Sequence, residues 1–293
     1  MLADQQIEAF LTLGYCVTRV SVPEASVDFA IKTVWDLCPS SFHPDNPESW
    51  HGEFEDCCKT QSLEDRRGRV KFRKCLRGER WLYDLTAGNG EIVAAVADLI
   101  GVPVTPQRVR GLYPVFPTPA VPVEGHCDKH KFQVGVVLYL SSVSRQGGGF
   151  TVWPGSHHIM AKHHGTLGGN DRLRSFNRAV AQVEKSIQPI EVIGGPGTVV
   201  LWHQRLVHTA GINTRPTVRH ATLCDFKNTS YLAAADRKAT DIWETWSPRV
   251  RELASAPGSR RKRTPETVRF MKARIFQSIL CLTSGGALCL VDL

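Results

Sequence analysis

The stretch from residue 106 to residue 230 alternates short apolar runs with clusters of glycine, proline, asparagine and serine. Runs rich in valine, leucine and tyrosine are typical of β-strands, and the polar clusters between them are typical of turns. We find no helical pattern between these runs, so the sequence predicts an antiparallel sandwich or jelly roll. The predicted strands cover 108–116, 132–140, 198–203 and 217–226.

Helical patterns flank this β core on both sides. We therefore expect a single domain over 1–293, with an N-terminal helical portion (1–105), a mainly β core (106–230) and a C-terminal helical extension (231–293). In the extension, Thr264-Pro265-Glu266 combines a helix cap, a proline at the first helical position and an acid. The other expected elements are helices at 4–13, 27–37 (capped by Ser26) and 89–100, a strand at 15–20 and a long loop at 161–178.

The positive charge of the chain is concentrated near its C-terminus. The net charge is +8, and the run from Arg249 to Arg274 carries +7 of it, as nine basic residues against two acids. A basic run of this kind is typical of a solvated linker, and no aromatic platform that could stack on bases interleaves with its densest part, Arg260-Arg261-Lys262-Arg263. We therefore expect no nucleic-acid partner.

The cysteines favour a reducing compartment. Nine occur, which is an odd number, and no two are spaced as Cys-x-x-Cys, so neither a disulfide framework nor a structural zinc site is expected. The first residues, Met1–Gln6, show no secretory signal. The apolar stretch Ile275–Leu293 is interrupted by polar residues, so we expect it to pack on the domain instead of entering a membrane. The predicted location is the cytoplasm.

A candidate metal motif, Gly125-His126-Cys127-Asp128, lies directly before the strongest predicted strand. Residues two apart in an extended chain point to the same side, so His126 and Asp128 can aim at a common point. A histidine from a neighbouring strand would complete two imidazoles and one carboxylate, a set that is diagnostic of non-haem Fe(II) oxygenases. The pattern His-x-Asp alone is weak, because a loop histidine beside a solvated aspartate is commoner.

Three further features follow the motif along the chain. Gly147–His157 contains a glycine-rich turn and Pro154-Gly155-Ser156-His157, and Gly197–Asn213 contains His208. Arg219 lies eleven residues after His208, on the next predicted strand.

As a set, these motifs from Glu124 to Phe226 resemble the phytanoyl-CoA dioxygenase family of Fe(II)- and 2-oxoglutarate-dependent oxygenases. The helix at 4–13 and the strand after Gly14 are also similar to the opening of that family. The resemblance implies a double-stranded β-helix with the metal inside its barrel. Together, these features extend the resemblance over most of residues 4–230.

The resemblance also implies roles for four residues. His126, Asp128 and His208 would bind iron, and Arg219 would hold the far carboxylate of 2-oxoglutarate through its bidentate fork. The implied reaction uses O2, releases succinate and CO2, and hydroxylates a small organic molecule. Halogenating relatives lack the carboxylate ligand, so Asp128 favours hydroxylation.

The sequence departs from the family at two positions. Ala210 stands where a hydroxyl residue often helps to hold 2-oxoglutarate, and Val137 stands where a tryptophan is common; Thr209 and Tyr139 are the candidates to compensate. The pair His203 and Arg215, twelve residues apart, is an alternative to His208 and Arg219. We expect the remaining candidates to be neighbours of the site or surface groups instead of ligands: His130, His157, His158, His163, His164 and His220.

Other functions stay open at this point. They are a metal-binding β-barrel that does not use 2-oxoglutarate, a non-catalytic binding protein, and an oxygenase acting on nucleic acid. The substrate is not readable from the sequence, because it depends on the loops at 43–69 and 157–185.

Overall fold

A computed structural model describes residues 1–56, 59–62, 67–102, 104–120, 122–168, 172–238 and 241–256. The predicted helix start at Thr264, most of the basic run and the apolar stretch Ile275–Leu293 lie outside these residues. The proposed division of the chain into three portions therefore stays a prediction. Among the described residues, no helix has the length and apolar character needed to cross a membrane.

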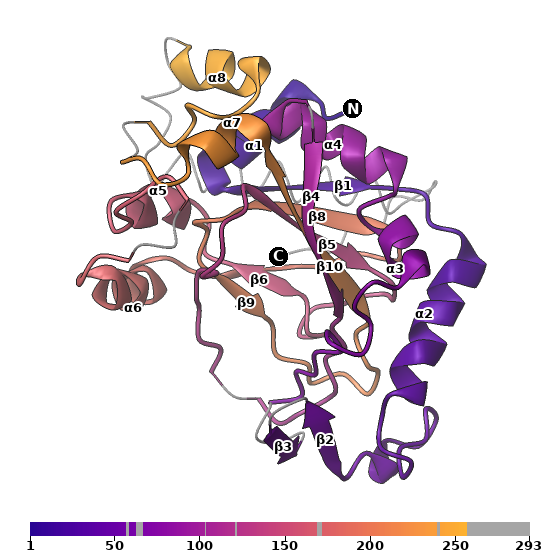
Figure 1. Ribbon diagram of the computed structural model, residues 1–293. Coiled ribbons are helices and arrows are strands. Elements are labelled where there is room, and N and C mark those ends of the chain that lie inside the picture. The colour runs from indigo at the N-terminus through magenta and orange to yellow at the C-terminus, as the bar shows by residue number, and fades with distance from the viewer. Residues whose placement is uncertain are drawn as a thin grey trace, which may run out of the picture.

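Two antiparallel sheets form the centre of the molecule (Figure 1). The larger sheet has the order β1 (Tyr15–Arg19), β8 (Thr198–His203), β5 (Val134–Tyr139), β10 (Ala221–Asn228) and β4 (Val104–Leu112). The smaller sheet has the order β7 (Ile190–Val192), β6 (Phe150–Val152) and β9 (His208–Ala210), and a separate hairpin joins β2 (Glu53–Asp56) to β3 (Lys59–Ser62). Neighbours in the sheets are mostly distant in sequence, as in a jelly roll.

The side chains of the larger sheet alternate between two cores. On β5, Val136 and Leu138 belong to the core under the helices, whereas Val137 and Tyr139 belong to a second core between the sheets. Trp202 and residues of the smaller sheet complete this second core. The alternation follows from the two-residue period of a strand, and burial on both faces explains why β5 is apolar throughout. The predicted mainly β jelly roll with flanking helices is confirmed.

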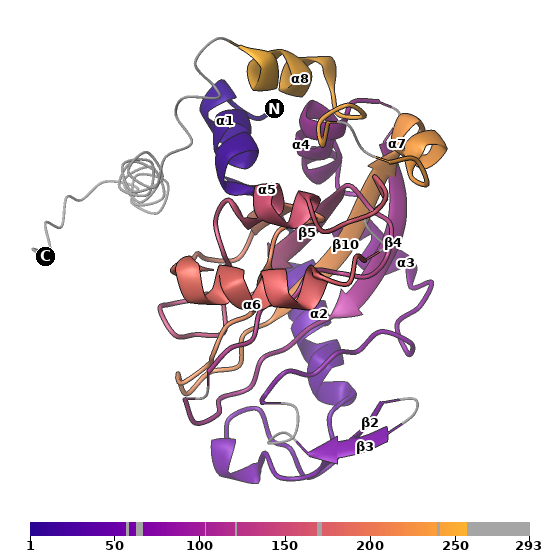
Figure 2. The same cartoon turned by 90° about the vertical axis from the view of Figure 1, so that its left-hand side faces the viewer.

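Helices cover the outer faces of both sheets. The core under the larger sheet contains residues of α2 (Glu24–Asp36), α3 (Arg80–Leu85) and α4 (Gly90–Ile100). Figure 2 shows α5 (Ser156–Ala161) and α6 (Phe176–Ser186) side by side on another flank. The remaining helices are α1 (Asp4–Leu13), the short 3-10 helix at Pro47–Ser49, α7 (Thr229–Ala234) and α8 (Pro248–Ser255).

Two of the sequence expectations are wrong in detail. Helix α2 begins at Glu24, directly after Pro23, so Ser26 lies inside the first turn and is not the cap. The run 161–178, expected to be a loop, ends in α6, and helices therefore do separate the core strands. The apolar residues of α6 recur at helical spacing (Phe176, Ala179 and Val183), but the polar residues between them hide this pattern in the sequence.

Candidate metal centre

His126, Asp128 and His208 meet at the edge of the smaller sheet. His126 and His208 form an antiparallel bridge in which their backbones exchange hydrogen bonds of 2.9 and 3.0 Å. One possible ligand atom from each of the three residues lies within 4.8 Å of the other two. Within the described residues, no other group of three His, Cys, Asp or Glu side chains converges in this way.

The two imidazoles of this triad are neutral and present a lone pair. His208 Nδ1 lies 2.9 Å from the Leu206 carbonyl oxygen and must therefore donate to it, which leaves His208 Nε2 unprotonated at 3.6 Å from Asp128 Oδ2. Burial lowers the pKa of His208. The pKa of His126 is lowered to about 3, by desolvation first and then by His208, although its side chain is exposed at the mouth of the site.

Asp128 supplies the negative charge of the site. Burial alone would raise the pKa of its carboxyl, but Arg110 outweighs burial through its charge and its hydrogen bond and holds that pKa well below its ordinary range. Two neutral imidazoles and an ionised carboxylate are the ligand set that suits Fe(II) with open coordination positions. The residues present therefore fit such a metal ion.

Arg110 and Asp225 are buried residues beside the triad that the sequence analysis missed. Arg110 Nε donates to both oxygens of Asp225 at 2.8 Å, and Arg110 Nη2 donates to Asp128 Oδ2 at 2.7 Å. The register of β4 and β10 shifts here, because Leu223 pairs with Gly111 and Cys224 pairs with Val109. Arg110 is thus the extra residue of a β-bulge, and a bulge re-aims a side chain.

The rival histidines lie elsewhere. His203 is buried, stacks on Trp246 with ring centroids 5.0 Å apart, and accepts a hydrogen bond from the Arg205 backbone at 3.0 Å. His130 Nε2 lies 2.8 Å from Asp225 Oδ2, so it neighbours the site without joining the triad. Arg215 is exposed and donates to the Arg145 carbonyl oxygen, so it does not form a pair with His203. Four further histidines are also not part of the converging triad, namely His157, His158, His163 and His164.

Arg219 is buried and lies two residues before β10. It therefore points to the same side as Ala221 and Leu223, which belong to the core between the sheets. Its Nε donates to the Gly148 carbonyl oxygen at 2.7 Å and its Nη1 to the Tyr113 carbonyl oxygen at 2.9 Å. Burial lowers the pKa of Arg219 to about 10, so the guanidinium stays charged at neutral pH. The two carbonyl groups fix the guanidinium and leave its Nη2 end for a ligand.

The two candidates to compensate for the departures from the family are already engaged. Tyr139 donates its hydroxyl to the Val192 carbonyl oxygen at 2.7 Å and accepts from the Phe150 backbone at 2.8 Å. Thr209 Oγ1 accepts from Arg69 Nη1 at 3.3 Å. The Tyr139 hydroxyl is therefore not a free replacement for the group missing at Ala210, whereas the Thr209 hydroxyl still has its own proton to donate.

Residues 84–221 match the model of the phytanoyl-CoA dioxygenase family. The matched range contains the converging triad and Arg219. This part of the chain is therefore similar to the phytanoyl-CoA dioxygenase family. No curated protein sequence matches the chain.

Solved structures with a similar fold include EctD, SnoN and EvdMO1. EctD from S. alaskensis, solved with bound Fe, has a TM-score of 0.55 at 16% identity, with 81% of this chain and 79% of EctD covered. SnoN, a non-heme alpha ketoglutarate dependent epimerase from nogalamycin biosynthesis, has a TM-score of 0.53 at 16% identity, with 78% and 83% covered. EvdMO1 has a TM-score of 0.53 at 17% identity, and the match covers 76% of this chain but only 49% of EvdMO1. At these identities the similarity concerns the fold.

Proposed function

We propose that this protein is a member of the phytanoyl-CoA dioxygenase family and an Fe(II)- and 2-oxoglutarate-dependent dioxygenase that hydroxylates a small organic molecule and releases succinate and CO2. The observation that carries the proposal is the convergence of two neutral imidazoles and one ionised carboxylate within 4.8 Å. EctD has been solved with Fe and, in another structure, with 2-oxoglutarate and 5-hydroxyectoine, which supports the same cofactors here.

In this proposal, His126, Asp128 and His208 hold the iron, and Arg219 holds the far carboxylate of 2-oxoglutarate. When bound, iron and 2-oxoglutarate supply the oxidising power, through decarboxylation of the cosubstrate in the presence of O2. The chain itself keeps the ligands oriented, because the Leu206 carbonyl fixes the His208 ring and Arg110 fixes the Asp128 carboxylate.

The surroundings of His208 also exclude water on one side. The ring of Phe150 stacks on the His208 ring with centroids 5.2 Å apart, and Trp202 lies at 5.5 Å. His126, in contrast, is exposed, so the site opens to solvent on the His126 side. A substrate would therefore enter from that side and meet the open coordination positions of the metal.

The proposal is tested by loading the purified protein with Fe(II) and 2-oxoglutarate without oxygen, and then admitting oxygen. We expect about one Fe(II) per chain and succinate release that depends on 2-oxoglutarate. His126→Ala, Asp128→Ala and His208→Ala should each abolish succinate release and keep the fold, whereas His163→Ala should retain it. Full activity in His208→Ala together with its loss in His203→Ala would show that the distal ligand is His203.

The mass of the product identifies the reaction. SnoN is an epimerase, so this fold also carries reactions that leave the mass of the substrate unchanged. Hydroxylation adds one oxygen atom, and that atom derives from O2. A product of unchanged mass would indicate that the reaction is an epimerisation and not a hydroxylation. The proposed metal site would still hold.

A further inference from the structure

A row of cations lies along the segment Arg69-Val70-Lys71-Phe72-Arg73, in which basic and apolar residues alternate. The segment extends the larger sheet beyond β4. Phe72 and Leu112 exchange backbone hydrogen bonds of 2.9 and 3.1 Å, and the Val70 backbone donates to the Pro114 carbonyl oxygen at 3.1 Å. In an extended chain, the three basic residues therefore lie on the face opposite to Val70 and Phe72.

That opposite face is the face of the metal centre. Val70 and Phe72 are buried in the core under the helices, so Arg69, Lys71 and Arg73 face the space between the two sheets. Arg69 Nη1 donates to Thr209 Oγ1 at 3.3 Å, and Thr209 directly follows the triad residue His208. Lys71 is close enough to Asp128 and His126 for their charges to interact.

The basic side chains of this segment and of β4 outnumber the carboxylates around them. On β4, Arg108 and Arg110 face Asp225 and Asp128, and among the acids of the neighbouring segment Glu124 pairs with Arg67 at 3.6 Å. In the described part of the chain, Lys71 and Arg73 form no hydrogen bond or ion pair, and both are exposed. Arg69 Nε is buried and has no hydrogen-bond partner there.

A surplus of positive charge at the mouth of a concave site attracts anions and strengthens their binding. The pKa of Lys71 is lowered by desolvation first and then by Arg73, and the opposing charge of Asp128 does not offset them. A divalent metal on Asp128 would enlarge the surplus further. An anionic group of a ligand would reduce it, and would find ammonium and guanidinium donors already in place.

We propose that Lys71 and Arg73 bind an anionic oxygen group, a carboxylate or a phosphate, on the primary substrate of this enzyme. The proposal rests on the proposed function, since it names the substrate class of the same site. Arg69 donates to Thr209, and its charge also interacts with that of Arg219. Variants of Lys71 and Arg73 that keep Arg69 therefore distinguish the proposed substrate position from that of 2-oxoglutarate.

The test measures anion binding by calorimetry on protein loaded with Fe(II) and saturating 2-oxoglutarate, without oxygen. The probes are inorganic pyrophosphate for a phosphate and tricarballylate for a carboxylate. The trimethyl ester of tricarballylate is the neutral control. We expect at least one of the two anions to bind, and the ester not to bind. In Lys71→Gln/Arg73→Gln the dissociation constant should rise about tenfold or more, as expected for two charge-assisted contacts.

A matched variant, Lys185→Gln/Arg178→Gln, removes the same two charges from the exposed face of α6 and should bind the anions as the wild type does. The concentration of 2-oxoglutarate that gives half-maximal binding should stay within about twofold in both variants, which is the scale of a screened surface effect. The inference is overturned if neither anion binds, if the ester binds equally well, or if Lys71→Gln/Arg73→Gln weakens 2-oxoglutarate instead. Calorimetry needs no turnover, so absence of succinate release with intact anion binding would contradict only the proposed function.

Discussion

Arg110 donates a hydrogen bond of 2.7 Å from Nη2 to Oδ2 of Asp128, and the same guanidinium holds Asp225 through Nε. Asp225 is fully buried and Arg110 is 6% exposed, so the two residues form a desolvated ion pair. The ring centroids of Phe132 and Trp202 lie 5.2 and 5.4 Å from the guanidinium carbon. The pair therefore connects the larger sheet to Asp128, the proposed metal ligand, through one rigid group.

Replacement of Arg110 by leucine should destabilise the fold, because it leaves Asp225 buried without a counter-charge. We expect a loss of about 3–5 kcal/mol in the free energy of unfolding, measured by urea denaturation at neutral pH. The double variant Arg110→Leu/Asp225→Leu removes both charges and should recover most of that loss. If Arg110→Leu alone were as stable as the wild type, the buried pair would contribute little to the stability of the fold.

Arg219 should set the affinity for 2-oxoglutarate. Arg219→Lys removes the guanidinium that the Gly148 and Tyr113 carbonyl groups hold in place, and an ammonium cannot offer the same fork. The 2-oxoglutarate concentration for half-maximal succinate release should rise about 10–100-fold, the scale of one or two charge-assisted hydrogen bonds, and further in Arg219→Ala. Arg215→Lys, on an exposed turn, is the matched control and should change nothing. An unchanged requirement in Arg219→Ala contradicts the assignment.

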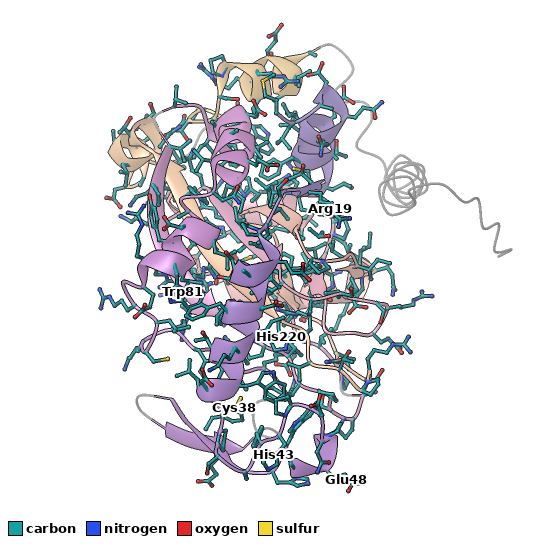
Figure 3. All side chains as sticks on the ribbon, turned by 90° about the vertical axis from the view of Figure 1, so that its right-hand side faces the viewer. Arg19, Cys38, His43, Glu48, Trp81 and His220 are labelled. Atoms are coloured by element: carbon teal, nitrogen blue, oxygen red, sulfur yellow. The ribbon has the colours of Figure 1, made fainter. Side chains whose placement is uncertain are left out.

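His220 should make the fold sensitive to acid. It packs beside Trp35 of α2 with ring centroids 6.2 Å apart, and its Nδ1 has no partner among the described residues. Figure 3 labels His220 beside α2. Burial, and then Arg219, lower its pKa to about 4. An unfolded histidine has a pKa of about 6.5, so the unfolded state takes up the proton first, and stability falls as the pH drops from about 6.5 to about 4.

The measurement is the free energy of unfolding at several pH values between about 6.5 and 4.5. His220→Phe keeps an aromatic ring beside Trp35 and removes the proton uptake. The pH dependence should therefore become shallower by up to about 1.4 kcal/mol per pH unit, the value for one proton. His43→Phe, at an exposed position, is the control and should keep the wild-type slope. An unchanged slope in His220→Phe would place the acid sensitivity in other groups.

Local patterns predicted the strands of the larger sheet and singled out His126 and Asp128, whereas His208 was assigned through the family resemblance. The strand 198–203 has the expected bounds, and His126 and Asp128 are two residues apart in an extended segment that pairs with His208. Arg110 was missed, because a β-bulge breaks the alternation that sequence reasoning relies on. Asp225 was missed because only the paired strands β4 and β10 bring it to Arg110, which lies more than a hundred positions earlier in the chain.

Asp128→Gly should create an anion site at the metal. The carboxylate would no longer occupy a coordination position, and Arg110 would keep its charge beside the vacated place, held there by Asp225. We therefore expect loss of hydroxylation and tighter binding of azide or chloride to the Fe(II)-loaded variant than to the wild type. The readout is the change in the metal's absorption spectrum during an azide titration. Halogenation of a substrate is a stricter outcome, since it also depends on how the substrate is placed.

The double variant Asp128→Gly/Arg110→Gln separates the two contributions to that anion site. It has the same vacant coordination position but lacks the guanidinium, so azide should bind it about tenfold more weakly than it binds Asp128→Gly, as expected for one charge-assisted contact. Wild-type protein should need no chloride for turnover, because Asp128 fills the position. A chlorinated product from the wild type, or azide binding that is equal in all three proteins, would mean that Asp128 does not occupy a position on the metal.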